Sequence, residues 1–205
     1  MKNKSIFFLG VLAIVSFGFG KPKKIKSSQV NVVIDAGHGG SDNGANVDGV
    51  TEKKIVEELI YKIQALNKNK NIIIHFTRSA DQFIPLDDRT TFINTIKPDL
   101  VLSLHVNSSI NKNISGIEFY VSKESTNYNS SNLIAEKFQS KFLNANFKVS
   151  EIKNADFYIL KKSEVPALIM ELGYLTNEND KKILVSNYEQ NQIAKKIIEC
   201  ISELK

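Results

Sequence analysis

Two histidines of this chain follow directly on apolar runs that are typical of buried strands. His38 follows Val-Val-Ile at residues 32–34 and lies among glycines, which let the backbone turn tightly beside the imidazole. His105 follows the nearly continuous apolar run of residues 100–104. In open α/β sheets, functional sites gather at the carboxyl ends of the strands, so both imidazoles are expected at one sheet edge. Either histidine taken alone could instead be a structural residue at a turn.

Two glutamates could complete a reactive group with these histidines. Glu52 stands at the start of a predicted helix that Thr51 can cap, on the same face as the apolar stripe of that helix. A carboxylate that points toward the sheet needs a partner, because an unpaired buried charge is costly. Glu171 ends the apolar run of residues 166–170. Each glutamate also has a purely structural alternative. Glu52 could interact favourably with the helix dipole from the first turn, and Glu171 could be a strand-end acid that pairs with an arginine.

His38, Glu52 and His105 together could supply three metal ligands and leave a fourth position for water. That arrangement is typical of catalytic zinc sites, whereas structural zinc sites close all four positions with protein ligands. A Glu171 carboxylate that faces such a metal could take a proton from the water and pass it to a leaving amine. Two histidines and one carboxylate also suit Fe(II), so a non-haem iron oxygenase is an alternative. The third histidine, His75, lies inside a predicted strand and is expected to be structural, not a ligand.

Alternating strands and helices must position these residues. Their order predicts one α/β domain with a mostly parallel, twisted central sheet of about six strands and helices on both faces. Strands are expected at residues 30–34, 72–76, 100–106, 116–121, 157–160 and 167–170. Helices are expected from residue 52 to about 63, from 87 or 88 to 96, around 133–142 and from 193 to 204, with a loop at 41–50.

The first 28 residues have the pattern of a leader and a tail, not of folded structure. Residues 1–20 combine a positively charged start, an uncharged apolar run and small residues at the end, which is typical of a secretory signal peptide. The apolar run is short for a transmembrane helix, which needs about 20 residues, and an uncleaved anchor is the alternative. Residues 21–28 form a basic tail, and residues 29–205 form the predicted domain. We therefore expect export to the periplasm or the extracellular envelope, without a transmembrane span in the mature protein.

Charge and cysteine content narrow the function classes. The formal net charge is +5, but six of the 27 Lys and Arg residues lie within residues 1–26, which hold no acid. The rest of the chain has 21 basic residues against 22 acidic ones, a net charge of −1. The basic character therefore gives no argument that the domain binds nucleic acid. The single cysteine, Cys200, lies in the last predicted helix, where a buried free thiol is expected.

Five motifs, in order along the chain, resemble those of the zinc-dependent N-acetylmuramoyl-L-alanine amidases, which are cell-wall hydrolases. They are DAGHGGSDNGA at residues 35–45, TEK at 51–53, the set Thr77, Arg78, Asp81, Leu86, Arg89 and Asn94, SLHVN at 103–107, and PALIMELGYLTN at 166–177. The resemblance runs from about residue 32 to residue 177. One departure is Ala36, where the family often has proline, and this change touches the stiffness of the turn.

The resemblance implies a role for each candidate residue and a reaction for the chain. His38, Glu52 and His105 would bind one Zn²⁺ per chain, and Glu171 would be the general base and acid. Residues 29–205 would be a zinc amidase catalytic domain that cleaves the amide bond between N-acetylmuramic acid and L-alanine in peptidoglycan. The expected biological settings are cell-wall remodelling, daughter-cell separation or lysis.

Several further expectations and alternatives accompany this interpretation. Arg89 and Asn107 are candidates for contacting substrate or supporting the site, and the protein is expected to be a monomer. Some family members carry an inhibitory helix after the strand at 116–121, but residues 122–150 leave room for only one ordinary helix, so an open site is expected. The alternatives are a zinc peptidase that acts on stem peptides and a catalytically silent peptidoglycan-binding or activator protein.

Overall fold

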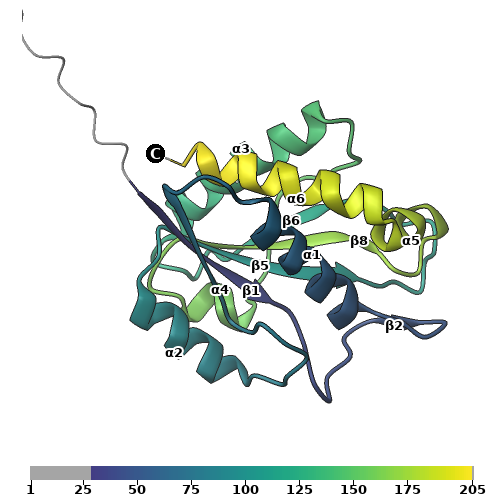
Figure 1. Cartoon of the computed structure of the whole chain (residues 1–205), viewed down its shortest axis with the longest axis horizontal. Helices are drawn as coiled ribbons and strands as arrows, with labels where there is room; N and C mark the ends of the chain where they lie inside the picture. Colours follow the sequence, from purple (N-terminus) through teal and green to yellow (C-terminus); the bar gives the residue numbers. More distant parts are fainter. Residues whose placement is uncertain (1–28, 205) are drawn as a thin grey trace, which may run out of the picture.

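A single mixed sheet forms the centre of the protein. The computed structural model describes residues 29–204, so the predicted signal peptide and basic tail lie outside the described residues. The sheet order is β4-β1-β5-β8-β6-β7 (Figure 1). Four neighbouring strands are parallel, and only β6 runs antiparallel to its neighbour β8. The prediction of a mostly parallel α/β sheet of about six strands is confirmed. The strands are β1 Val30–Ala36, β4 Ile72–Phe76, β5 Leu100–Asn107, β6 Glu118–Val121, β7 Lys153–Asn154 and β8 Ala167–Tyr174, with β2 Asn46–Val47 and β3 Val50–Thr51 in a separate hairpin.

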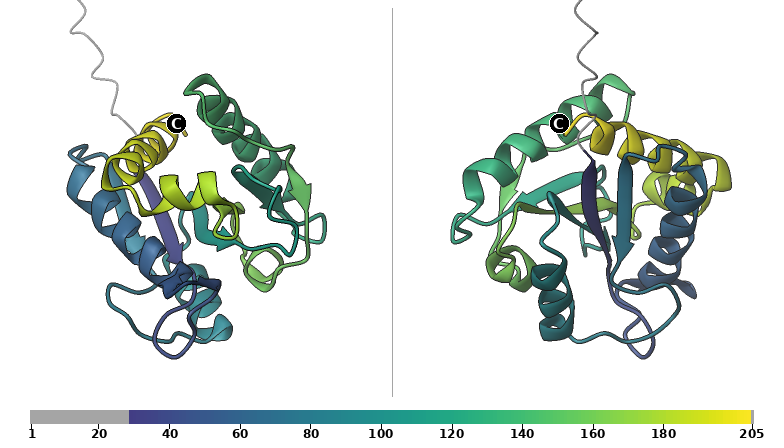
Figure 2. Two further views of the ribbon diagram at one scale, coloured as in Figure 1. Left: turned by 90° about the vertical axis from the view of Figure 1, so that its right-hand side faces the viewer. Right: turned by 60° about the vertical axis from the view of Figure 1, so that its left-hand side comes forward.

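Helices cover both faces of this sheet. Within residues 29–204 they are α1 Glu52–Leu66, α2 Leu86–Ile96, α3 Tyr128–Asn144, α4 Tyr158–Lys162, α5 Glu178–Val185 and α6 Asn187–Ser202. The long helices α1, α3 and α6 lie on one face, while α2 and α4 lie beside each other on the opposite face (Figures 1 and 2). The same division appears in the packing, because two separate hydrophobic clusters lie on the two sides of the sheet.

The alternation of side chains along the central strands decides which residues reach the site. Ile34 and Leu102 belong to the cluster on the α1 side, whereas Val33 and Val101 belong to the cluster on the α2 side. Successive side chains of a strand point to opposite faces, so Asp35 lies on the α2 side with Val33. On this face, toward the carboxyl ends of the strands, buried polar side chains such as Asp35 and Ser103 take the place of apolar ones.

The structure differs from the predicted elements in three places. Residues 157–160, predicted as a strand, lead into the helix α4, because a helical turn buries Ile159 and Leu160 together against the sheet. The helix α5 was not predicted, although its cap is visible in the sequence: the Asn177 side chain accepts hydrogen bonds from the amides of residues 179 and 180. The predicted loop at 41–50 contains the hairpin strand β2 and the first residue of β3.

Several element ends also differ from the prediction. Glu171 does not end its strand, since β8 continues to Tyr174. Thr51 occupies the N-cap position of α1, but its side chain makes no capping hydrogen bond. The helices α2 and α6 begin earlier than predicted, at residues 86 and 187. Cys200 is buried and free, as predicted. Between residues 29 and 204 the longest helices are too short or too polar to cross a bilayer.

Candidate metal centre

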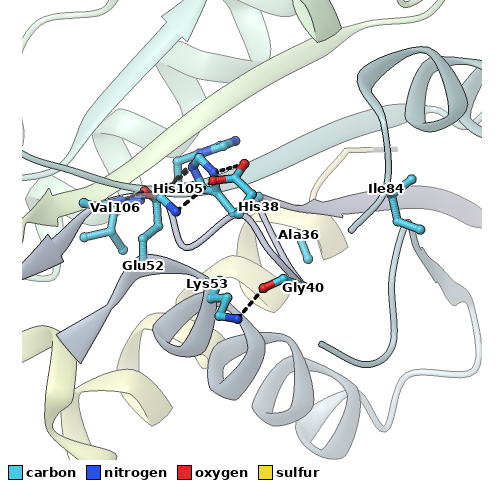
Figure 3. Close-up of polar contacts among 12 residues, drawn as sticks. Ala36, His38, Gly40, Glu52, Lys53, Ile84, His105 and Val106 are labelled. Atoms are coloured by element: carbon cyan, nitrogen blue, oxygen red, sulfur yellow. Dashed lines mark hydrogen bonds and ion pairs between the residues drawn. The ribbon is translucent and has the colours of Figure 1, made fainter. Parts of the chain in front are cut away.

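The structure brings His38, Glu52 and His105 together at the carboxyl ends of β1 and β5. One possible ligand atom from each residue lies within 4.8 Å of the others. Nε2 of His38 lies 3.1 Å and Nδ1 of His105 lies 2.9 Å from the same oxygen, Oε1 of Glu52 (Figure 3). The two imidazoles meet edge to face with their ring centroids 5.0 Å apart. Three residues from distant parts of the chain therefore point their donor atoms at one small volume.

Glu52 is the buried centre of this group and is only 4% exposed. Besides the imidazoles, Oε1 accepts a hydrogen bond from the amide of Val106 at 2.9 Å, and Oε2 accepts one from the amide of Ala45 at 2.8 Å. Burial opposes the charged form, but the hydrogen bonds from His105 and His38 outweigh it and hold the pKa of Glu52 well below its usual range. The carboxylate is therefore ionised, oriented and ready to bind a cation.

His38 is oriented by a second carboxylate that sequence reasoning did not assign. Its Nδ1 donates a hydrogen bond to Asp42 at 2.7 Å, which leaves Nε2 directed at Glu52. A carboxylate on the far nitrogen is the usual support of a metal-binding histidine. Burial lowers the pKa of His38, but the hydrogen bonds to Glu52 and Asp42 outweigh this effect and raise the pKa to about 9. The four-residue spacing between His38 and Asp42 was the available signal in the sequence.

Two glycines are pressed against the candidate ligand side chains. A Cβ atom at Gly37 would lie 2.5 Å from Cε1 of His105. A Cβ atom at Gly44 would lie 2.3 Å from Oε2 of Glu52. Atoms this close cannot coexist, so a side chain at either position would push a candidate ligand out of place. The glycine-rich segment thus makes room for the other two ligands as well as shaping the turn around His38.

We expect Gly37→Ala to weaken zinc binding by about 10–100-fold, the range seen when the support of a ligand is lost. The new methyl group would displace the His105 ring and would also lie 2.8 Å from the carbonyl oxygen of Leu104, whereas the backbone of Gly37 itself needs no left-handed conformation. The measurement is competition with a chelating dye. Gly49→Ala is the control. Its φ of 79° means that alanine costs stability, but a Cβ atom there would lie in open space, so the affinity for zinc should not change. Equal affinities for the Gly37 variant and the unmodified protein would contradict the prediction.

Arg89 and Asp35 form a buried ion pair beneath the segment that carries His38. Nη1 of Arg89 lies 2.7 Å from Oδ1 of Asp35, and the two side chains are 4% and 1% exposed. The same guanidinium donates to the carbonyl oxygens of Ala36 at 2.5 Å and His38 at 2.7 Å. His38 has a φ of 59°, an uncommon conformation for a residue with a side chain, and Arg89 helps to hold it. The structure therefore places the predicted supporting residue Arg89 behind the His38 loop.

Asp35 is a hub that sequence reasoning missed. In addition to Arg89 it accepts hydrogen bonds from the hydroxyls of Thr77 at 2.8 Å and Ser103 at 2.6 Å. Burial opposes ionisation, but the charge of Arg89 and the hydroxyl of Ser103 keep the pKa of Asp35 below its ordinary value. An acid directly after the apolar run of residues 32–34 was the signal in the sequence. Arg78 adds two hydrogen bonds, to the carbonyls of Ala36 at 3.2 Å and Gly37 at 3.0 Å.

Ala36 departs from the resembling motif, and the structure offers a local explanation for alanine instead of proline at this position. Its amide donates a hydrogen bond to Oγ1 of Thr77 at 3.1 Å. Proline has no amide hydrogen and could not make this bond. The turn is held instead by the two arginines, which both bind the Ala36 carbonyl. Rigidity at this position therefore comes from side-chain hydrogen bonds.

Glu171 lies on the strand next to His105 and borders the same cleft. The two residues are paired in register between β8 and β5. Its Oε2 atom is buried and has no hydrogen-bond partner within the described residues. Burial raises the pKa of Glu171 to about 7, although the nearby His105 pulls in the opposite direction. A buried carboxyl group that is free of hydrogen bonds and has a pKa near neutrality can both accept and donate a proton.

Two other residues considered in the sequence lie apart from this group. Asn107 is the last residue of β5, and its amide nitrogen is 3.4 Å from Oε2 of Glu118 on β6, the strand beyond β8. His75 lies on the edge strand β4 and is not a member of the three-residue group. The structure thus places Asn107 beside the Glu118 carboxylate and His75 at the sheet edge.

The three-residue group opens into a cleft of about 280 Å³. His38, His105 and Glu171 line one end of it, and apolar side chains from the segment before α2 and from α4 line the other. The helix α3, formed from residues 128–144, packs against β6, β8 and α6 and lines no part of this cleft. No described residue between 122 and 150 covers the three-residue group, in agreement with the expected open site.

The chemistry of the donor set fits a zinc ion. Two imidazole nitrogens and one ionised carboxylate oxygen are ligands that zinc binds in hydrolytic enzymes, where a fourth position stays open. The open cleft beside the group and the unpaired Oε2 of Glu171 match that pattern. His38 and Glu52 also have supporting hydrogen bonds, from Asp42 and from main-chain amides, as metal ligands generally do.

Comparison with known proteins gives a consistent result. Residues 32–203 match the family described as N-acetylmuramoyl-L-alanine amidase. The uncharacterized protein YqiI of Bacillus subtilis is 33% identical over 82% of this chain and 81% of its own length. The sporulation-specific N-acetylmuramoyl-L-alanine amidase of the same organism is 31% identical over 79% of this chain and 63% of its own length. The crystal structure of an N-acetylmuramoyl-L-alanine amidase from Clostridium difficile 630 superposes with a TM-score of 0.79 at 28% identity, covering 85% and 95% of the two chains.

Proposed function

Because the chain belongs to the N-acetylmuramoyl-L-alanine amidase family, we propose that it hydrolyses the amide bond between N-acetylmuramic acid and L-alanine in peptidoglycan, with zinc as cofactor. His38, Glu52 and His105 would hold one zinc ion per chain. The observation that carries this proposal is the convergence of these three donor groups at a cleft that Glu171 also lines.

The side chains of this site are suited to amide hydrolysis. A bound zinc ion supplies Lewis acidity, which polarises a carbonyl oxygen and makes water a stronger acid. Oε2 of Glu171 accepts the proton of the attacking water and then donates it to the nitrogen of the leaving L-alanine. Asp42 holds the His38 ring through Nδ1, and Arg89 fixes the main chain on either side of Gly37.

The proposed substrate lies outside the cytoplasmic membrane, which requires export of the protein. The charged start and apolar run of residues 1–20 support a signal peptide, and we propose that it delivers the domain to the periplasm or the extracellular envelope. We further propose that the enzyme acts as a monomer, because all the candidate site residues come from one chain.

We expect the purified, zinc-loaded protein to release stem peptides with a free L-alanine amino terminus from isolated sacculi. Removing the metal with a chelator should abolish release, and adding zinc back should restore it, because the ion held by the three candidate ligands would supply the Lewis acidity that polarises the amide. Mass spectrometry of the soluble products measures both effects.

The same products separate the alternatives. A zinc peptidase would release fragments cut within the stem, and a silent wall-binding protein would release nothing above the chelated control. An iron enzyme would recover with Fe(II) under reducing conditions and not with zinc. Any of these three results would overturn the proposed reaction.

A further inference from the structure

The cleft beside the candidate metal centre has a wall that the proposed chemistry does not use. From His38, His105 and Glu171 it extends toward the segment before α2 and the start of α4. This far wall consists of apolar side chains on opposite sides of the cleft, which we call the aromatic wall: Phe83, Ile84, Leu86, Phe157, Tyr158 and Ile169. A volume of about 280 Å³ is at the low end for small-molecule sites, so it suits one ring-sized group.

Three rings of this wall are exposed, and the two most exposed, those of Phe83 and Phe157, could contact a ligand directly. Phe83 is 54% exposed and Phe157 is 43% exposed, on two segments that are far apart in the sequence. The ring of Phe157 is held in place by an edge contact with Tyr120, with centroids 5.4 Å apart. Large apolar side chains gathered at the mouth of a cleft, and not scattered singly, mark an interaction site. The two rings therefore form a preformed apolar surface next to Glu171.

The charges of the cleft argue against the stem peptide as the occupant of this wall. The carboxylates of Asp42 and Glu171 line the cleft. Among residues 29–204, the only lysine or arginine that lines it is Arg89, whose guanidinium is engaged by Asp35 and by the carbonyls of residues 36, 38 and 84. A stem peptide carries free carboxylates, and beyond the metal centre the aromatic wall offers them no charged side chain as a partner.

The neutral sugar of the substrate matches the same surface. A pyranose ring presents a face of C–H groups, and the N-acetyl and lactyl substituents of muramic acid each add a methyl group. Such a face packs on exposed aromatic rings, which offer a large apolar area in a fixed geometry. Its hydroxyl groups can stay in contact with water at the open side of the cleft.

We propose that the aromatic wall binds the N-acetylmuramoyl sugar, so that the stem peptide extends away from α2 and α4. This inference rests on the proposed function, because it concerns the orientation of the same substrate. It assigns Phe157 and Phe83 as residues that determine specificity for the presence of the sugar. They hold the scissile amide beside Glu171 through the sugar that is attached to it.

The test compares two soluble substrates with the same peptide. One is N-acetylmuramoyl-L-alanyl peptide, and the other is D-lactoyl-L-alanyl peptide, which keeps the scissile amide and lacks the sugar. For Phe157→Ala, the ratio of kcat/KM for the first substrate to that for the second is expected to fall about tenfold, which corresponds to about 1.4 kcal/mol. Phe83→Ala, on a different segment, is expected to lower the same ratio and serves if the first variant does not fold.

Tyr188→Ala is the matched control, because Tyr188 is an aromatic residue of α6 that is 67% exposed and does not line the cleft. Its ratio should equal that of the unmodified protein. Equal losses on both substrates in the Phe157 and Phe83 variants, or no loss, would overturn the sugar assignment.

A binding measurement separates this inference from the proposed reaction. The neutral methylamide of N-acetylmuramic acid is titrated calorimetrically into the zinc-loaded protein, and binding about tenfold weaker is expected for Phe157→Ala and not for Tyr188→Ala. If the unmodified protein cleaves neither peptide but this binding pattern is found, the proposed reaction fails and the sugar site stands. If both peptides are cleaved and the methylamide binds the Phe157 variant as tightly as the unmodified protein, the sugar site fails alone.

Discussion

Replacing Glu171 by glutamine is expected to lower the rate of stem-peptide release by about 10²–10⁴-fold, the range contributed by a positioned general acid and base. Glutamine has the same shape but cannot accept the proton of water or return it to an amine. Oε2 of Glu171 has no hydrogen-bond partner within residues 29–204, so the substitution breaks no bond at that atom. Glu171 is not one of the three grouped ligands, so one zinc ion per chain should still bind.

The measurement combines release from sacculi with zinc content determined on the same protein sample. Glu136→Gln is the matched control, because Glu136 is exposed on α3, away from the cleft, and its loss should leave the rate unchanged. If the Glu171 variant with full zinc content releases peptide as fast as the unmodified protein, Glu171 does not move the proton. Equal, background-level release from both would support the silent wall-binding alternative.

Replacing Arg89 by methionine is expected to lower the free energy of unfolding by about 3–5 kcal/mol, the cost of removing one member of a buried ion pair. Asp35 is 1% exposed and would keep its charge without the guanidinium that compensates it. The carbonyls of Ala36 and His38 would also lose a donor, so the His38 turn would lose support. The midpoint and slope of urea unfolding measure the change.

Two further variants test the cause of this loss. In Asp35→Asn combined with Arg89→Met the uncompensated charge is gone, so part of the stability should return. Lys54→Met removes a cation from an exposed position on α1 and should change the free energy of unfolding by less than about 0.5 kcal/mol. If the Arg89→Met variant is as stable as the Lys54→Met variant, the ion pair contributes nothing to stability.

The candidate ligands could be found from the sequence because their positions follow from simple periodicities. His38 and His105 follow apolar runs of parallel strands, and such strands end at the same sheet edge. Glu52 lies on the buried face of α1, and the structure confirms that this face turns toward the sheet. The signals for Asp42 and Asp35 do not identify their partners, because a hydrogen bond to a particular imidazole or guanidinium depends on the tertiary arrangement.

The wrong prediction at residues 157–160 has a different cause. A short run of Phe, Tyr, Ile and Leu suits a strand or a buried helical turn equally, and periodicity over four residues cannot distinguish them. The choice is made by the sheet, whose α2 side offers a surface onto which Ile159 and Leu160 pack together. The contact between Gly37 and the ring of His105 is equally hidden, since 68 residues of sequence separate them.

The position of the ligand strands within the sheet bears on the working lifetime of the protein. His38 follows β1 and His105 lies on β5, and both strands are in the sheet interior, because β1 lies between β4 and β5, and β5 lies between β1 and β8. Interior strands separate from their neighbours only when the whole domain opens, whereas a short edge strand such as β7 can fray alone. The two strands that position the imidazoles therefore stay paired for as long as the sheet is intact. Inactivation by heat and global unfolding would be the same event, so a substitution anywhere in the core that slows unfolding would also prolong activity.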